Sequence, residues 1–247
     1  MLWGNLNDLS FSAGSHNGQV LDETTFLDDM NHLKENIIVN DSEDVWAYIT
    51  SLSKGNTQLS IILDNGALEL ASDLCFAVFC TEHNIFSKVV FYVKRIPWFV
   101  SDVTFEDFKW TLEHLKGDHA QQLSEKCLEY LNSKRWEVVI EDFWTLPLPY
   151  SVMKKEDEKL YEKLIQNDLL IFKGDLNYRK LGGDLHWPAT TRFVEFLRGF
   201  QPAPLLAVRT IKAEIVCGLA DGKKEYLSQK NADWMRSGEY AVIQFAK

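Results

Sequence analysis

The stretch LSIILDNGALEL, Leu59 to Leu70, joins an apolar run to a helix-like pattern through Asp64, Asn65 and Gly66. The run from Leu59 to Leu63 is nearly all apolar, which is typical of a strand buried on both faces of a parallel sheet. The polar pair could be an Asn-Gly turn in which Asp64 caps the next helix. Alternatively, Asp64 and Asn65 could ligate one metal ion, with Gly66 permitting a sharp backbone bend. This segment by itself favours the turn.

Apolar runs of strand length alternate with helical patterns along the rest of the chain. The apolar runs predict strands near Ser60–Leu63, Lys88–Lys94, Trp136–Ile140, Leu169–Lys173, Leu205–Ile211 and Tyr240–Phe245. Helical patterns fall at Ser42–Leu52, Leu68–Glu82, Phe105–Lys116, His119–Ser133, Lys155–Gln166 and Thr190–Arg198. We expect Thr104 to cap the third helix, with Asp107 in its first turn. The alternation predicts an α/β fold with a three-layer, doubly wound, mostly parallel sheet flanked by helices.

The bulk composition is that of an ordinary soluble globular protein. The 247 residues are 46% hydrophobic and 25% charged, with a formal net charge of −10, and we treat 1–247 as one domain with an irregular N-terminal segment, 1–40. The sequence has no basic stripe and no run of about 18 apolar residues, so we expect neither nucleic acid nor a membrane as partner. We interpret Cys75, Cys80, Cys127 and Cys217 as reduced thiols in the core. Reduced thiols suggest a cytoplasmic protein, and a nuclear location is left open.

Polar residues follow the first five predicted strands, at the point where each strand ends. They are Asp64-Asn65, Asp102, Glu141-Asp142, the run from Lys173 to Arg179, and Arg209 with Lys212. In open α/β sheets, ligands bind beyond the carboxyl ends of the strands. Carboxylate and amide oxygens beside cations suit a hard divalent metal that holds a phosphate group. The sequence therefore predicts a metal and phosphate site at this edge of the sheet.

The segment FKGDLNYRK, Phe172 to Lys180, favours function more strongly than the other polar stretches. Gly174 allows a ligand to approach the backbone closely after Lys173 leaves the strand. Asp175 could orient a sugar hydroxyl, and the guanidinium of Arg179 could hold a phosphate in a fork. A solvated loop would not need so many kinds of side chain.

Two other features have ordinary structural interpretations. Asp102 alone is best explained as a helix cap. In RTIK, Arg209 to Lys212, the two cations are three residues apart and would point to opposite faces of a regular strand. Either the strand has ended by Lys212 or the cations have different roles, and a plain exposed strand end explains them about equally well. The sequence contains no G-x-G-x-x-G, Walker or G-x-S-x-G motif.

A set of motifs in fixed order resembles a known family over essentially the whole chain. The motifs are LWGNLNDLS (Leu2–Ser10), ILDNGALEL (Ile62–Leu70), PWFVSDVT (Pro97–Thr104), FWTLPLPY (Phe143–Tyr150), FKGDLNYRKL (Phe172–Leu181), WPATTRF (Trp187–Phe193), RTIK (Arg209–Lys212) and YAVIQF (Tyr240–Phe245). The chain closely resembles the damage-control phosphatases of subfamily III, also described as sugar-phosphate phosphatases and acidic-residue (protein-glutamate) methyltransferases.

The resemblance implies a metal-dependent phosphatase that uses Mn²⁺, or Co²⁺ or Ni²⁺, and acts on small phosphorylated metabolites such as fructose 1-phosphate. It assigns the metal to Asp64, Asn65 and Asp102, with Lys212 completing the catalytic set. The implied substrate contacts are Asp175, Leu176, Asn177, Tyr178, Arg179 and Lys212, beside Lys173 and Arg209. Glu69 occupies the position of an acid that contacts S-adenosylmethionine in the family.

The chain departs from the family pattern in two places. The family usually has Asn, a small residue and then Gly, whereas this chain has Asn65-Gly66-Ala67. If that position needs a positive φ, Ala67 costs roughly 1 kcal/mol or more. Full-length relatives also carry a mainly helical N-terminal region before LWGN, which we expect this chain to lack. The rival expectations are S-adenosylmethionine-dependent methyl transfer to a protein glutamate, which needs a protein substrate, and an inactive truncated remnant.

Overall fold

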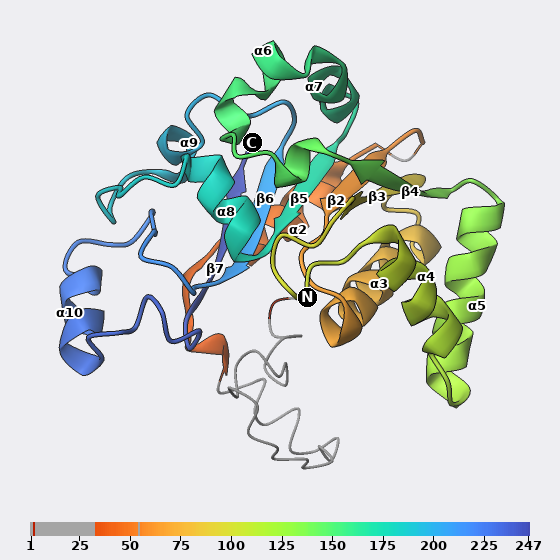
Figure 1. Ribbon diagram of the computed structural model, residues 1–247, viewed down its shortest axis with the longest axis horizontal. Coiled ribbons are helices and arrows are strands. Elements are labelled where there is room, and N and C mark those ends of the chain that lie inside the picture. The colour runs from red at the N-terminus through yellow and green to blue at the C-terminus, as the bar shows by residue number, and fades with distance from the viewer. Residues whose placement is uncertain (1, 3–32, 54) are drawn as a thin grey trace.

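A seven-stranded sheet forms the centre of the computed structural model, which describes residues 2, 33–53 and 55–247. Its strands are β1 (Ile37–Asn40), β2 (Gln58–Ile62), β3 (Lys88–Lys94), β4 (Trp136–Glu141), β5 (Leu169–Lys173), β6 (Leu205–Thr210) and β7 (Ala241–Ala246). The strand order is β1-β7-β6-β5-β2-β3-β4, and only the β6–β7 pair is antiparallel among these strands. The predicted mostly parallel sheet is therefore confirmed (Figure 1).

Helices cover both faces of the sheet and bury its alternating side chains. One face packs against α2 (Ser42–Ser51), α3 (Ala67–Glu82), α4 (Phe105–His114) and α5 (Asp118–Asn132). The other packs against α6 (Met153–Glu156), α7 (Glu158–Ile165), α8 (Gly174–Gly182) and α9 (Phe193–Phe196), with α10 (Lys223–Lys230) beyond them. Ile61 and Ile62 illustrate the alternation, because they belong to the cores on opposite faces. The three-layer arrangement is visible in Figure 1.

The six predicted strands all occur, with ends within two residues of expectation. The chain also forms β1, which lies inside the segment 1–40 that the sequence predicts to be irregular. Among the described residues, this four-residue strand pairs with β7 alone, so its partner comes from the other end of the chain and gives no local signal. Residues 1 and 3–32 of that segment, which include the LWGNLNDLS motif after Leu2, lie outside the described residues.

The helices correct several expectations. The predicted Thr104 cap is confirmed, because Thr104 and Asp107 form a reciprocal capping box at α4. The single helix expected over Lys155–Gln166 is instead α6 and α7, which are separated at Asp157, whose side chain caps α7. The expected helix over Thr190–Arg198 is reduced to the four residues of α9. Neither α8 nor α10 is predicted from the sequence pattern.

Two further observations concern the surface. Cys75 is exposed, so only Cys80, Cys127 and Cys217 are the buried thiols that the sequence predicts. No helix in the described part of the chain is long and apolar enough to span a bilayer.

Candidate active site

The strand order reverses beside β2 and β5. From β2 the chain continues to β3 and β4 on one side, and then returns to build β5 and β6 on the other. Such a switch point leaves a crevice beyond the carboxyl ends of the two central strands, because the connections diverge there. β2 ends just before Asp64, and β5 ends at Lys173 just before Gly174. The fold therefore places the two most suggestive motifs of the sequence next to each other.

The structure brings Asp102 to Asp64 and Asn65. Asn65 and Asp102 form an isolated antiparallel bridge, and the amide N–H of Val103 donates to the carbonyl oxygen of Asp64 at 2.9 Å. Neither acid caps a helix: the residue at the N-terminal cap of α3 is Gly66, and that of α4 is Thr104. The helix-cap interpretations of Asp64 and Asp102 are therefore wrong.

Hydrogen bonds orient the amide of Asn65. Its Nδ2 donates to Asp64 Oδ2 at 2.8 Å and to Glu69 Oε2 at 3.1 Å, while its Oδ1 accepts from the Ser101 hydroxyl at 2.7 Å. Asn65 thus links the end of β2, the first turn of α3 and the β3–α4 loop. Ser101 was not singled out in the sequence, although it directly precedes Asp102.

The backbone of the β3–α4 loop anchors Asp102. Its Oδ2 accepts the amide N–H groups of Trp98 at 2.9 Å and Phe99 at 2.8 Å. Its Oδ1 lies 2.8 Å from the ammonium nitrogen of Lys94, the last residue of β3, which also lies 3.7 Å from Asp64 Oδ1. Lys94 is buried, and nothing in the sequence around it indicates this contact.

A second buried lysine organises the neighbouring acids. The ammonium of Lys173 donates to Glu69 Oε1 at 2.7 Å and to the two Asp73 oxygens at 2.9 and 3.1 Å. Asp73 lies one turn after Glu69 on α3 and is fully buried. No sequence pattern singles out Asp73, since an acid on a helix is usually solvated.

The buried cluster carries more negative than positive charge. It contains four carboxylates and two ammonium groups: Asp64, Glu69, Asp73, Asp102, Lys94 and Lys173. Burial, and next the charge of Glu69, raises the pKa of Asp64 to about 7. With all six groups ionised, two negative charges would be unbalanced, which is the charge that one divalent cation neutralises.

Gly174 shapes the space around Asp64. It has φ 82°, and a Cβ atom built on it would lie 1.8 Å from Asp64 Oδ2. A side chain at this position would therefore displace the carboxylate. The oxygen donors and the excess negative charge fit a divalent metal at Asp64, Asn65 and Asp102.

The two cations of RTIK have different environments. β6 ends at Thr210, and Arg209 is buried, with its Nε and Nη2 at 2.8 and 2.7 Å from Asp175 Oδ1. Arg209 also donates to the carbonyl oxygen of Ala213 at 3.0 Å. The backbone N–H of Lys212 reaches the same Asp175 oxygen at 3.3 Å. Arg209 therefore fastens α8 to the loop that carries Lys212.

A cavity of about 440 Å³ opens above these groups. Seven residues selected from the sequence line it: Asp64, Asn65, Glu69, Asp175, Leu176, Arg179 and Lys212. Five others do not line it: Asp102, Lys173, Asn177, Tyr178 and Arg209. Gly174, where the sequence predicts a close approach of a ligand, also lines it. The remaining lining residues, which sequence reasoning missed as site residues, are Leu2, Phe99, Val100, Ser101, Val208 and Thr210.

The buried residues of α8 make internal hydrogen bonds. Asn177 Oδ1 accepts from the Tyr150 hydroxyl at 2.5 Å, and Asn177 Nδ2 donates to the carbonyl oxygen of Lys173 at 2.7 Å. The Tyr178 hydroxyl donates to Gln244 Oε1 at 2.7 Å. Both side chains therefore fix α8 against the core. By contrast, Arg179 lies at the cavity and forms a two-pronged ion pair with Asp184 at 2.8 and 3.0 Å.

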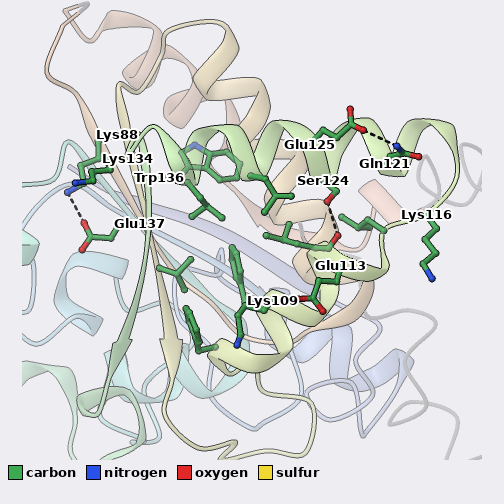
Figure 2. Close-up of a pocket in the computed structure, with 17 residues that line it drawn as sticks. Lys88, Lys109, Glu113, Lys116, Gln121, Ser124, Glu125, Lys134, Trp136 and Glu137 are labelled. Carbon is green, nitrogen blue, oxygen red and sulfur yellow. Dashed lines mark hydrogen bonds and ion pairs between the residues drawn. The ribbon is translucent and has the colours of Figure 1, made fainter.

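A larger groove of about 1080 Å³ lies away from this site, between α4, α5 and the edge strand β4. Figure 2 shows its labelled charged side chains around the rim, with Lys88 paired to Glu137 at 2.9 Å. Its floor is mainly apolar, and the Ser124 hydroxyl is bonded to the carbonyl oxygen of Leu112. The groove holds none of the residues selected from the sequence.

No group of three or more His, Cys, Asp or Glu side chains arranged to hold a metal occurs in the described part of the chain. The set predicted here has only two acids and one amide, so it is not a group of that kind.

Known proteins are similar in sequence to this chain over nearly its full length. Residues 1–227 match the damage-control phosphatase ARMT1-like domain. The chain is 41% identical over 252 residues to Damage-control phosphatase ARMT1 of Rattus norvegicus and 42% over 254 residues to that of Danio rerio. Each match covers 99% of this chain and 56% of the relative, so the chain spans about half the length of these curated relatives. By this similarity, the chain belongs to the damage-control phosphatase ARMT1-like family.

Proposed function

We propose that this chain is a metal-dependent phosphatase that hydrolyses small phosphorylated metabolites, with fructose 1-phosphate and related sugar phosphates as the substrate class. The observation that carries the proposal is the cavity at the switch point, where Asp64 and Asn65 face the same space as Lys212 and Arg179. Anionic oxygen donors beside cations are the combination that a metal-assisted phosphoryl transfer needs.

Asp64, Asn65 and Asp102 would hold Mn²⁺, or Co²⁺ or Ni²⁺ in its place. The bound metal would supply Lewis-acid chemistry at the phosphoryl group. Glu69 and Ser101 hold the Asn65 amide so that its orientation is set before ligands arrive.

The cations in the cavity wall would bind the phosphate. Lys212 and Arg179 line the cavity and would neutralise negative charge on the phosphoryl oxygens. Asp175 would orient a sugar hydroxyl through Oδ2, because its contacts to Arg209 and Lys212 all use Oδ1. Leu176 would contact the carbon skeleton from the same wall.

The substrate assignments of Lys173, Asn177, Tyr178 and Arg209 change in this proposal. Their side chains are buried and bonded to protein groups, so we give them the role of positioning α8 and the Lys212 loop. Their loss would act through the geometry of the cavity walls.

The test is phosphate release from fructose 1-phosphate by the purified chain with Mn²⁺. We expect activity in the wild type and a loss of at least about 100-fold in Asp64→Ala. Asp142→Ala is the matched control, because Asp142 also follows a strand but is exposed and pairs with Arg95. Equal rates in wild type and Asp64→Ala would contradict the metal assignment.

Methyl transfer from S-adenosylmethionine to a protein glutamate is the alternative, since Glu69 lines the cavity. Both Glu69 oxygens are already engaged, Oε1 by Lys173 and Oε2 by Asn65, which favours a structural role for this acid. Calorimetric titration with S-adenosylmethionine separates the two, because the phosphatase proposal requires no binding. An inactive remnant would be folded but would release no phosphate with any divalent metal.

A further inference from the structure

Lys94 is a buried cation that contacts both acids of the proposed metal site. Its ammonium nitrogen lies 2.8 Å from Asp102 Oδ1 and 3.7 Å from Asp64 Oδ1, and its side chain is 1% exposed. It does not line the cavity, so it cannot touch a substrate bound there. Its ammonium group contacts the two acidic residues, and it also donates to the backbone carbonyl oxygen of Asp64 at 3.5 Å.

Both carboxylates keep other anchors that do not depend on Lys94. Asp102 Oδ2 accepts two backbone N–H groups, from Trp98 and Phe99. Asp64 Oδ2 accepts from Asn65 Nδ2 at 2.8 Å and is confined by Gly174. The geometry of the acids is thus set largely by the backbone and by Asn65. What Lys94 adds is its positive charge.

We propose that Lys94 is a resident counter-ion that holds Asp64 and Asp102 together in the metal-free protein and weakens the binding of the divalent metal. This inference rests on the proposed function, because it takes these two acids as metal ligands. A cation coordinated by either carboxylate is repelled by the ammonium on the same carboxylate, and the repulsion is strong because water is excluded. The site stays folded without metal, and the metal remains exchangeable.

The experiment compares wild type with Lys94→Met, which is unbranched, one atom shorter than lysine and uncharged. Mn²⁺ affinity is measured by competition with a fluorescent chelator, and thermal unfolding is followed in EDTA and in saturating Mn²⁺. We expect Lys94→Met to bind Mn²⁺ at least about tenfold more tightly. Its Tm should fall by several degrees in EDTA, and Mn²⁺ should raise that Tm more than it raises the Tm of wild type.

Two further variants make the result decisive. Lys94→Gln removes the charge but can still hydrogen-bond Asp102, and it replaces Lys94→Met if that protein does not fold in EDTA. Lys88→Met is the matched control, because Lys88 lies at the other end of β3 and pairs with the exposed Glu137. We expect Lys88→Met to bind Mn²⁺ like wild type.

The outcomes distinguish this inference from the proposed function. Unchanged or weaker Mn²⁺ binding in the neutral Lys94 variants, with normal binding in wild type, overturns the counter-ion role and leaves the metal site intact. A merely structural lysine would give that result, because its loss would disorder the ligands. If wild type itself binds no Mn²⁺, the proposed metal site fails, and this inference fails with it.

Discussion

The cavity beyond β2 and β5 and the groove between α4 and α5 differ in size and in the placement of charge. The groove is larger, about 1080 Å³ against about 440 Å³. Its charged side chains lie at the surface and are of both signs, as with Lys88 and Glu137. The cavity instead has buried carboxylates behind it and two cations in its wall.

The difference teaches that convergent buried charge, and not volume, identifies the candidate site. Surface charges are solvated and cost little to keep, so their presence at the groove needs no ligand. Buried carboxylates in excess of buried lysines are costly unless another cation or a proton balances them. The four predictions below test this contrast.

The largest expected effect comes from Gly174→Ala. The new Cβ would collide with the Asp64 carboxylate, and the positive φ of 82° adds backbone strain. We expect phosphatase activity to fall at least about 100-fold and the free energy of unfolding to fall by about 2 kcal/mol or more. Gly199→Ala is the control, because Gly199 has φ 81° with nothing within 4 Å of its Cβ position. It should lose only about 1 kcal/mol of stability at full activity. Equal activity losses in the two variants would show that backbone strain, and not a collision with Asp64, causes the loss.

Lys212→Ala should reduce kcat/KM by about 100-fold, because Lys212 lines the cavity and would face the phosphate. Lys116→Ala removes the same kind of charge from the groove and should leave kcat/KM unchanged. Steady-state kinetics on fructose 1-phosphate with Mn²⁺ measure both. If Lys116→Ala also lost activity, the groove could no longer be treated as separate from the chemistry.

The effect of pH on stability should change sign with metal. Burial raises the pKa of Asp64 to about 7 and that of Asp73 to about 6, above the value of 3.8 expected when unfolded. The folded metal-free protein therefore holds protons that the unfolded chain releases. This stabilisation is present below about pH 4 and is lost as the pH rises to about 7, with a size of about 2 kcal/mol or more.

Metal binding reverses this dependence, because ligand carboxylates must be ionised. In EDTA, the urea midpoint should fall as the pH rises from about 5 to about 7, and in saturating Mn²⁺ it should rise. Slopes of the same sign in both solutions would argue against a metal at Asp64.

The smallest effect concerns Ala67, the first residue of α3, which has φ 52°. The sequence analysis expected backbone strain at Ala67 if its φ were positive. Because φ is positive, that strain is present. We expect Ala67→Gly to raise the free energy of unfolding by about 1 kcal/mol. Gly66→Ala is the control, since Gly66 has φ −73° and room for a Cβ, so it should change stability little. Urea unfolding measures both free energies of unfolding. A lower free energy of unfolding in Ala67→Gly than in wild type would contradict the presence of strain at Ala67.

Much of the fold and part of the site follow from local sequence. The strands can be predicted because apolar runs of strand length are a local signal, and the ends of parallel strands meet at one edge. That rule is sufficient to bring Asp64, Asn65 and Asp102 together. It does not reveal Lys94, which is simply the last residue of a strand until the β3–α4 loop folds over it.

Other parts of the fold and of the site could be identified only in the folded chain. The polar run after Lys173 gave no helical signal, yet α8 forms there because Tyr178 and Leu181 are buried in the core. The resemblance implies a substrate contact at Arg209, but its donors are used by Asp175 and by backbone carbonyls. A sequence motif selects residue types, and only packing shows which of them face a ligand.

The sequence by itself determined the α/β layering, the positions of the strands other than β1, and the family, because periodicity and motif order are properties of neighbouring residues. The tertiary structure decided the electrostatics of the site: which acids are buried, which lysines balance them, and where charge remains unbalanced. These depend on contacts between residues such as Glu69 and Lys173, which are 104 positions apart. The physical reason is desolvation, since the energy of a charge depends on the water that the whole fold removes from it.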